Sequence, residues 1–395
     1  MITAADFDPF SVSVITDPYP WYSALHEGPR VLRDDRWDIW ILSRHADVRE
    51  AVRDHARYSS AEGVTYVRAP LPMMLTMDPP DHERLRRIVG REFAPRDIER
   101  FRPAVERFVD DGLEELAGSR DLVESLAVPV PIRVMAEILG VPGTDIPDLR
   151  RMADDLVKGF ALAPADSAGG DASVATFDFG RITQAIVDIH GYFSTMIVER
   201  RAHPADDLVT KLIEPTGDGR LSDDELLWFC LLLLVAGIET TTNLIGNMVI
   251  ALSDHPDQWQ VIRKRHELIP SAVNESLRFD PPIQGFFRTT VAAVSVGDVD
   301  IPKGARVLLS FGAANRDPTH YDDSDAYRVD RNPTDHLSFG SGIHRCLGAG
   351  LAELEGRIVL EKLVERAQTL EIGGEVVRTA NPTLRGAVVL PVRLG

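Results

Sequence analysis

Apolar residues recur along this chain mainly at the spacing of a helix face. Within 97–116 they fall close to the i, i+3, i+4, i+7 spacing, and the segments 132–139 and 182–198 look similar. Residues 349–367 also favour a helix. Strand-like runs are fewer and shorter. These patterns predict a mainly α-helical protein.

The longest apolar run covers 13 residues, 226–238, inside a longer predicted helix. Ser222 and Glu225 form a capping box at its start, and His255-Pro256 ends it, so we expect a helix over 223–253. A membrane-spanning helix needs about 20 apolar residues. The run therefore indicates a buried helix and no membrane segment.

The strand signals predict a smaller β region. Residues 37–42 and 305–309 are candidate strands, and 291–301 has the pattern of a hairpin with Gly297-Asp298 at its turn. The segment 161–180 is rich in Ala, Gly, Pro, Ser and Asp, which predicts a surface loop between helices. No linker divides the sequence, so we expect a single domain over 1–395.

Charge and cysteine content exclude several classes of protein. The chain has 61 acidic and 43 basic residues, a net charge of −18, which argues against nucleic-acid binding. Its two cysteines, Cys230 and Cys346, cannot form a disulfide framework and fit a reducing compartment. The N-terminus lacks the pattern of a signal peptide. A cytoplasmic protein is therefore expected.

One of these cysteines lies in a glycine-rich segment that precedes a predicted helix. Residues 339–348 read Phe-Gly-Ser-Gly-Ile-His-Arg-Cys-Leu-Gly. A thiolate gains from N–H groups at a helix N-terminus, and glycines let the backbone approach a flat ligand. The alternatives are a buried apolar cysteine, a dinucleotide-binding loop, or a zinc site. Arg345 stands where a dinucleotide loop has its third glycine, and zinc would find only His344 nearby.

This segment resembles the haem-thiolate signature of the cytochrome P450 superfamily. The match rests on Phe339, Gly340, Gly342, His344, Cys346 and Gly348. The resemblance implies the cytochrome P450 fold, with Cys346 as the axial ligand of haem b (iron protoporphyrin IX) and O2 as co-substrate. A thiolate ligand favours O–O cleavage. Cys230, within the long apolar helix, is expected to pack in the core.

A second motif interrupts the long helix with residues that helices disfavour. Ala236-Gly237-Ile238-Glu239-Thr240-Thr241 places glycine and threonines in mid-helix, at a cost of up to about 1 kcal/mol each relative to alanine. A small-residue contact between helices would explain this composition. In the resembled family the motif activates oxygen, which implies that Glu239 is the acid and Thr240 the alcohol of a proton-delivering pair.

The resemblance also assigns residues that hold the cofactor. His82 and Arg86 are four apart and share a face if 80–86 is helical, a spacing that a solvated charged helix also shows. By resemblance, these two residues, Arg288 and His344 bind the haem propionates, for which the planar fork of arginine is suited. The remaining expected haem contacts are Phe339, Gly340, Ala236, Gly237 and Gly348.

Two charged residues one helical turn apart are expected to stabilise the haem-binding face. Glu275 and Arg278 have the i, i+3 spacing of ordinary surface pairs. The resemblance implies instead a buried ion network that Arg331 completes.

The resemblance further indicates which side chains contact a substrate. Residues 282–290 are similar to bacterial members that oxidise para-substituted benzoic acids, which suggests a small aromatic substrate. Leu232 and Val235 stand where those members have polar residues, and a neutral terpene-like molecule is the alternative. Arg68 is the available carboxylate partner. The expected lining is Val64, Tyr66, Val67, Leu71, Met73, Leu232, Val235, Ala236, Ile283, Gln284, Phe286 and Thr383.

The family resemblance implies an oxidoreductase that needs electrons from another protein. The window from His82 to Arg102 contains seven arginines and four acids, which is a local positive excess in an acidic chain. Such a patch steers an acidic partner, and we expect a 2Fe-2S ferredoxin with its NAD(P)H-dependent reductase. The expected function is monooxygenation, by hydroxylation or O-demethylation, in a monomer. The alternatives are a peroxide-driven peroxygenase and a non-catalytic haem sensor.

Overall fold

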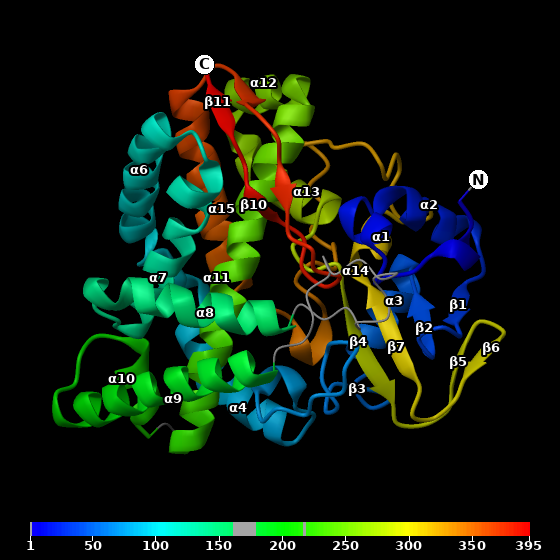
Figure 1. Ribbon diagram of the computed structural model, residues 1–395, viewed down its shortest axis with the longest axis horizontal. Coiled ribbons are helices and arrows are strands. Elements are labelled where there is room, and N and C mark those ends of the chain that lie inside the picture. Colours follow the sequence, from blue (N-terminus) through cyan, green and yellow to red (C-terminus); the bar gives the residue numbers. More distant parts are fainter. Residues whose placement is uncertain (1, 161–178, 216–218) are drawn as a thin grey trace.

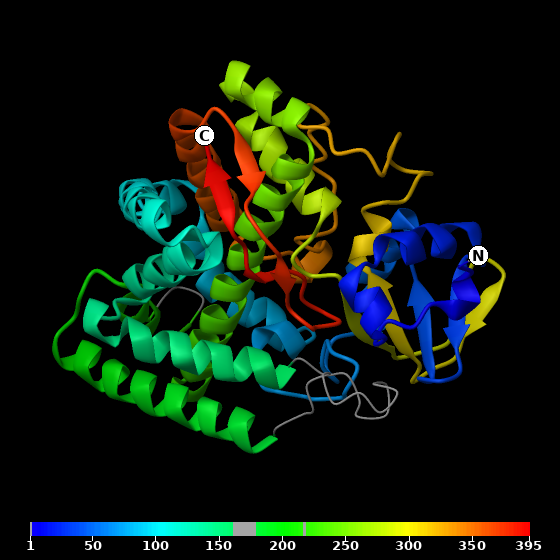
Figure 2. The ribbon, with the colours of Figure 1, turned by 45° about the horizontal axis from the view of Figure 1, so that its top comes forward.

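The computed structural model describes residues 2–160, 179–215 and 219–395. A larger helical region and a smaller sheet region lie side by side, and the long helix α11 runs through the helical region (Figures 1 and 2). This architecture confirms the predicted mainly α fold with a smaller β region. The α-helices are α1 Val12–Thr16, α2 Tyr19–Glu27, α3 His45–Arg53, α4 Asp81–Val89, α5 Pro95–Glu99, α6 Arg102–Ser119, α7 Pro129–Leu139, α8 Ile146–Phe160, α9 Phe179–Ala202, α10 Leu208–Ile213, α11 Asp223–Asp254, α12 Pro256–Lys264, α13 Ile269–Phe279, α14 Phe311–Ala314 and α15 Ala349–Arg366.

Helix α11 is the central element of the helical region. The Ser222 hydroxyl accepts a hydrogen bond from the Glu225 N–H, and the Glu225 carboxylate accepts one from the Ser222 N–H, so the predicted capping box is present. The helix is long and apolar enough to span a membrane, but 67% of its most apolar window is buried inside the protein. It contacts α7, α9, α13 and α15, which explains an apolar surface on several sides.

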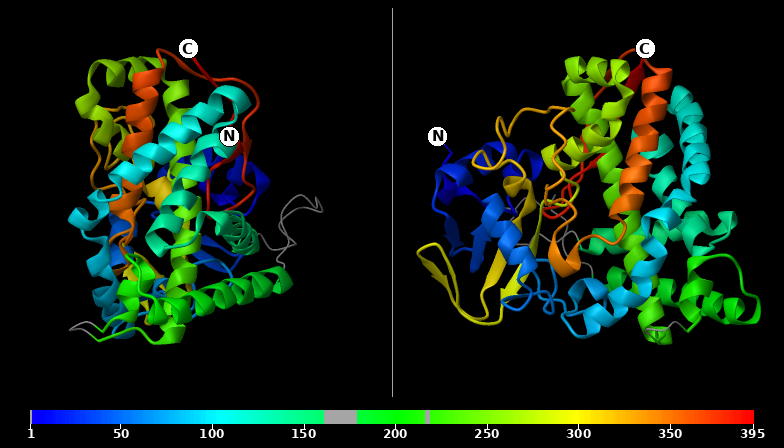
Figure 3. Two further views of the ribbon diagram at one scale, coloured as in Figure 1. Left: turned by 90° about the vertical axis from the view of Figure 1, so that its left-hand side faces the viewer. Right: turned by 180° about the vertical axis from the view of Figure 1, so that it is seen from behind.

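Other helices match the apolar periodicity except at their ends. The segment predicted as one helix over 97–116 contains two, because α5 ends at Glu99 and α6 begins at Arg102 with Pro103 in its first turn. Helix α6 lies beside α15, which Figure 3 shows as a cyan and an orange helix in contact. Most of the loop predicted over 161–180 lies outside the described residues, and its last two residues belong to α9.

The main sheet has five strands in the order β1-β2-β7-β4-β3. Strands β2 and β7 are parallel, and the other neighbours are antiparallel. The predicted hairpin over 291–301 is β5 and β6, and Gly297 at its turn has a φ of 64°. The strands are β1 Val31–Asp34, β2 Ile39–Leu42, β3 Tyr58–Ser59, β4 Gly285–Thr290, β5 Val294–Val296, β6 Val299–Ile301, β7 Arg306–Ser310, β8 Leu370–Ile372, β9 Val377–Arg378, β10 Ala387–Val389 and β11 Val392–Leu394.

Candidate active site

The cysteine segment folds into a tight loop just before α15. The Cys346 N–H donates to the Phe339 carbonyl at 2.8 Å, and the Gly340 N–H donates to the Leu337 carbonyl at 2.9 Å. Gly340 and Gly342 have φ values of 64° and 69°, which L side chains rarely adopt. A Cβ on Gly342 would also lie only 3.0 Å from the Cα of Arg53 in α3. The loop therefore depends on glycine at both positions.

Cys346 faces a large, mostly apolar cavity between α11, α15, α4 and the sheet. The cavity contains about 1420 Å³ of space between protein atoms, part of it open to solvent. Cys346 is accessible and is one of the residues that line this cavity. Burial raises the pKa of the Cys346 thiol, whereas the Gly348 N–H and the guanidinium groups of Arg86 and Arg345 lower this pKa. The cavity thus presents a sulfur ligand next to positive charge.

One end of the cavity gathers hydrogen-bond donors without an anionic partner. His82, Arg86, Arg288 and His344 all line it. The Nδ1 atom of His82 and the Nε2 atom of His344 are buried without a hydrogen-bond partner in the described structure. Among the described residues, no carboxylate forms an ion pair with Arg86 or Arg288. The Arg86 and Arg288 side chains donate to the carbonyls of Arg345 and Phe287, at 2.7 and 2.9 Å.

These donors fit an anionic ligand. Arg288 is 2% exposed, and burial lowers its pKa to about 10. A buried cation without a counter-ion is costly, so the site gains when acidic groups of a ligand arrive there. Burial also lowers the pKa of His344, because a neutral ring is favoured in the absence of an anion. An apolar cavity with a thiol and this donor cluster fits haem, a flat apolar cofactor with two propionates.

Helix α11 forms the wall of the cavity where its sequence motif lies. Ala236, Gly237 and Thr240 all line the cavity, and a Cβ on Gly237 would lie 2.8 Å from the sulfur of Met135. The Thr240 hydroxyl donates to the Ala236 carbonyl at 2.6 Å. Glu239 is not among the lining residues. Its carboxylate accepts from the Asn243 amide at 3.4 Å, and burial raises its pKa.

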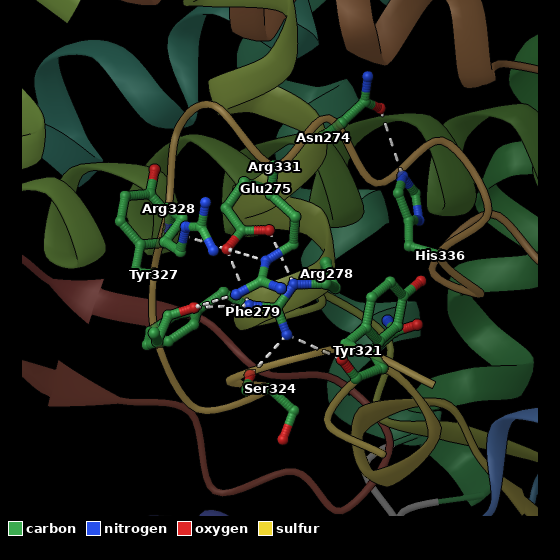
Figure 4. A network of polar contacts seen from close by, with 12 residues as sticks. Asn274, Glu275, Arg278, Phe279, Tyr321, Ser324, Tyr327, Arg328, Arg331 and His336 are labelled. Carbon is green, nitrogen blue, oxygen red and sulfur yellow. Dashed lines mark hydrogen bonds and ion pairs between the residues drawn. The ribbon is translucent and has the colours of Figure 1, made fainter. Parts of the chain in front are cut away.

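The charged residues expected to stabilise the site form a buried network in the structure (Figure 4). The Glu275 carboxylate accepts from the Arg278 guanidinium at 2.7 and 2.8 Å and from Arg331 Nε at 3.2 Å. Arg278 also donates to the Asn315 carbonyl at 2.9 Å. The Asn315 side chain in turn accepts a hydrogen bond from the Leu337 N–H and donates one to the Ser338 hydroxyl. This chain of contacts connects the network to the residues that precede the cysteine loop.

All predicted cofactor contacts line the cavity, but only part of the predicted substrate lining does. Leu232, Ala236, Ile283 and Phe286 line it. The other predicted contacts are not among the lining residues; they are Val64, Tyr66, Val67, Leu71, Met73, Val235, Gln284 and Thr383.

The surroundings of these residues explain their different positions. Gln284 accepts from the Tyr22 hydroxyl at 2.6 Å and donates to the Pro281 carbonyl at 2.7 Å, so its amide is engaged by these two partners. The Tyr66 ring packs against Phe10, Trp37 and Phe287 in the core below the sheet. Val67 lines a separate surface hollow.

Several lining residues were not predicted. Phe229, Leu233 and Leu244 belong to α11, and helical spacing from Ala236 and Thr240 could have identified them. Met74, Leu75 and Phe93 come from short 3₁₀ segments, where no periodicity indicates which side faces inward. Glu355 in α15 was also missed. It lies on the same helix face as the buried residues Leu351, Ile358 and Val359. An acid among apolar residues at this spacing could have indicated a functional position.

The fold and the cavity together define a haem-thiolate protein. A loop before a helix presents one cysteine to a cavity that fits haem, and a long helix with a threonine motif forms the wall. Residues 35–393 match the family model described as Cytochrome P450. The chain therefore belongs to the cytochrome P450 family, and proteins of this family use haem b and O2 for monooxygenation.

Curated relatives and solved structures agree with this assignment. The chain is 41% identical over 393 residues to the beta-dihydromenaquinone-9 omega-hydroxylase of Mycobacterium tuberculosis, covering 98% of this chain and 78% of that protein. It is 38% identical over 406 residues to the vitamin D(3) 25-hydroxylase of Pseudonocardia autotrophica, with 98% and 96% covered. The solved structure of the bacillaene polyketide synthase cytochrome P450 PksS of Bacillus subtilis 168 superposes with a TM-score of 0.88 at 30% identity, with 98% and 100% covered. The protein is an oxidoreductase of this class.

Proposed function

We propose that this protein inserts one oxygen atom of O2 into a C–H bond of a neutral apolar molecule, with electrons from a 2Fe-2S ferredoxin and its NAD(P)H-dependent reductase. The observation that carries this proposal is the single cavity that Cys346 and Thr240 both line. A sulfur ligand and a hydroxyl group therefore line the same cavity. We propose a cytoplasmic monomer of one domain.

Five residues of the cavity have a role in haem binding in this proposal. Cys346 would hold the haem iron, and His82, Arg86, Arg288 and His344 would hold the propionates. Metal coordination deprotonates a thiol, so the raised pKa of free Cys346 does not oppose ligation. When bound, haem supplies the iron-centred reduction of O2 that a thiolate ligand favours. The protein orients the bound molecules, excludes water from the cavity and delivers protons.

Thr240 and Glu239 are the proposed proton-delivering pair. The Thr240 hydroxyl donates a hydrogen bond to the Ala236 carbonyl, so its oxygen lone pairs are available to accept a hydrogen bond from a donor in the cavity. The raised pKa of Glu239 brings a carboxylic acid closer to neutral pH, as general acids require. Glu239 lies outside the lining, so a water molecule or a rotation of its side chain would connect the two residues.

The substrate is proposed to be neutral. Within the described structure, every cationic residue of the cavity wall belongs to the propionate cluster or to the cysteine loop. Arg68, the candidate partner for a benzoate, pairs with Glu62 and donates to the Gly304 carbonyl at 2.9 Å. The hydroxylases of dihydromenaquinone and vitamin D(3) among the relatives are named for largely apolar molecules. These observations favour the terpene-like alternative over a para-substituted benzoic acid.

The proposed ferredoxin surface is smaller than the arginine count suggests. Arg84 pairs with Glu225, Arg96 with Asp97 and Arg102 with Glu99, so at least three of the seven arginines have an acidic partner. Arg87 and Arg345 are exposed. Arg86, next to Arg87 on α4, reaches the Arg345 carbonyl beside Cys346. This basic face, defined by Arg87 and Arg345, supports docking of an acidic partner behind the cysteine loop.

One set of spectra and one assay test the proposal. The reduced protein with carbon monoxide is expected to show the Soret band of a thiolate-ligated haem, and Cys346→His is expected to lose it. NADH consumption with ferredoxin and reductase separates a monooxygenase from a peroxygenase and from a haem sensor. Neutral apolar compounds are expected to shift the spin state, whereas a shift by 4-methoxybenzoate would overturn the neutral-substrate assignment.

A further inference from the structure

A second hollow opens beside the neighbouring strands β2 and β7 of the main sheet (Figure 1). It contains about 1270 Å³ of space between protein atoms, part of it open to solvent. Within the described structure it shares no lining residue with the cavity around Cys346. We call it the sheet hollow and define it by five of its lining residues, Trp37, Trp40, Tyr66, Arg68 and Arg306. The function proposed above gives none of these five residues a role.

Arg306, on β7, is a buried cation in the wall of the sheet hollow. The residue is 5% exposed. Its Nη1 atom donates to the Thr289 hydroxyl at 3.0 Å, and its Nη2 atom donates to the carbonyls of Gly63, at 2.9 Å, and Thr65. Its Nε atom is buried and has no hydrogen-bond partner in the described part of the chain. All three partners are neutral groups, and a buried charge without a counter-ion is costly.

The carboxylate of Glu62 lies near Arg306 but already has a cationic partner. Glu62 pairs with Arg68 and accepts from the Thr289 hydroxyl at 3.0 Å, so its contact with Arg306 passes through that hydroxyl. Burial, with the charges of Arg68 and Arg288, lowers the pKa of Arg306 to about 9. The two arginines and one glutamate leave an excess positive charge beside the sheet hollow. This excess favours the binding of an anion.

Aromatic rings form the apolar part of the sheet hollow. Trp37, Trp40 and Tyr66 are each half-buried. The Trp37 and Tyr66 rings pack edge to face with their centroids 5.9 Å apart, and the Trp40 ring centroid lies 5.2 Å from the Arg33 guanidinium. Rings held in this way offer flat apolar surface to another ring. Small-molecule sites combine such surface with a few placed polar groups, and the sheet hollow has both features.

We propose that the sheet hollow is a binding site for a small organic anion that carries a flat ring, such as an aromatic carboxylate. The acidic group of this ligand lies beside Arg306 and Arg68, and its ring packs against the aromatic side chains of the wall. Binding is non-covalent and takes place outside the cavity around Cys346. The site goes beyond the monooxygenase function proposed above and does not depend on it.

Calorimetric titration of the haem-loaded protein with naphthoate tests the proposal. We expect naphthoate to bind, to quench tryptophan fluorescence and to leave the spin state of the haem unchanged. Uncharged naphthamide and inorganic phosphate, which has no ring, are each expected to bind about tenfold more weakly or less, because each lacks one of the two recognised features.

Four variants show whether naphthoate occupies the sheet hollow. We expect Arg306→Met to weaken binding by about tenfold or more and Arg306→Lys to retain part of it. Arg68→Met is expected to weaken binding severalfold, and because Arg68 is 48% exposed this variant decides the question even if Arg306→Met does not fold. Arg265→Met is the matched control, since Arg265 is 56% exposed and pairs with Glu267 as Arg68 pairs with Glu62.

The proposal is overturned if naphthoate does not bind at millimolar concentration, or if naphthamide or phosphate binds equally well. Binding that shifts the spin state and is unchanged in the Arg306 and Arg68 variants would place naphthoate in the haem-binding cavity and would also overturn it. A protein without the thiolate spectrum or turnover would refute only the proposed function, because naphthoate binding is measured without turnover.

Discussion

The Thr240 hydroxyl donates a hydrogen bond of 2.6 Å to the Ala236 carbonyl one turn earlier in α11. Threonine is disfavoured within helices, but this contact fixes the Thr240 oxygen in the cavity wall. The proton of the hydroxyl is engaged with the backbone, so the oxygen faces the cavity as an acceptor. Helix α11 therefore holds a polar atom at a fixed position in an otherwise apolar wall.

Replacement of Thr240 is expected to uncouple electron use from product formation. General acid–base groups contribute about 10²–10⁴-fold to a rate. We expect Thr240→Ala to lower product formation at least by the lower part of this range while NADH is still consumed, and Thr240→Ser to restore part of it. Thr242→Val is the control, since Thr242 is buried on the same helix but is not part of the cavity wall. Equal product per NADH in Thr240→Ala and the control would refute the role.

The Glu275–Arg278 pair is expected to contribute to folding rather than to chemistry. Both side chains are 0% exposed, and removal of one partner leaves a buried charge unpaired. We expect Glu275→Gln to lower the free energy of unfolding by about 3–5 kcal/mol, measured by urea unfolding. Haem content should fall with it, because the network reaches the residues before the cysteine loop through Asn315. Unchanged stability with lost activity would show a different role.

Local rules predicted much of this fold because they act within a few residues. The capping box at Ser222, the proline after His255 and the glycine turn at Gly297 depend only on neighbouring side chains. The end of α5 at Glu99 was missed because apolar periodicity continues through Ile98, Phe101 and Val105 although the helix does not. Periodicity indicates which face is buried and does not indicate every break in the backbone.

The cavity could be predicted only where a motif fixes position. The cysteine segment and the threonine motif lie on defined elements, so Cys346 and Thr240 line one cavity as expected, although Glu239 does not line it. Gln284 differs, because its orientation depends on Tyr22, which lies 262 residues away in sequence. The substrate lining comes from side chains of distant segments, and no short-range pattern specifies which of them turn inward. Burial of Glu355 likewise depends on the packing of α15 against α11 and α13.

Arg288 is expected to serve the cofactor at the expense of the protein's own stability. The side chain is a buried cation without an ion pair among the described residues, and such a charge destabilises the fold until an anion arrives. We expect Arg288→Leu to bind haem more weakly, yet to leave the haem-free protein at least as stable as before. Haem titration and urea unfolding of the haem-free form measure the two effects. A large loss of stability in the haem-free variant would contradict this interpretation.

Charge reversal at Arg87 tests the basic face without touching the cavity. Arg87 is exposed, and Arg86 beside it is the residue that lines the cavity. We expect Arg87→Glu to slow ferredoxin-driven turnover, more at low than at high ionic strength, because screening weakens interactions between exposed charges. Peroxide-driven turnover should stay unchanged. Lys303→Glu, on the sheet region, is the matched control for net charge, and equal effects of both reversals on both assays would refute a docking site.

The pH dependence of stability is expected to reveal the buried acid. The folded-state pKa of Glu355 is raised from an ordinary value of 4.5 to about 8. Between these two values the folded protein binds the proton that the unfolded chain has lost, so Glu355 makes the protein progressively less stable as pH rises through this window. One proton corresponds to about 1.4 kcal/mol per pH unit.

Glu355→Gln removes this dependence, because an amide does not titrate. We expect the stability of Glu355→Gln relative to the unmodified chain to increase by up to about 3 kcal/mol between pH 5 and pH 7.5, measured by urea unfolding at each pH. Other titrating groups cancel in the difference between the two proteins. Glu361→Gln is the control, since Glu361 lies on the same helix, is partly exposed and is not part of the cavity wall. A difference between Glu355→Gln and the unmodified chain that does not vary with pH would mean that Glu355 is ionised in the folded protein.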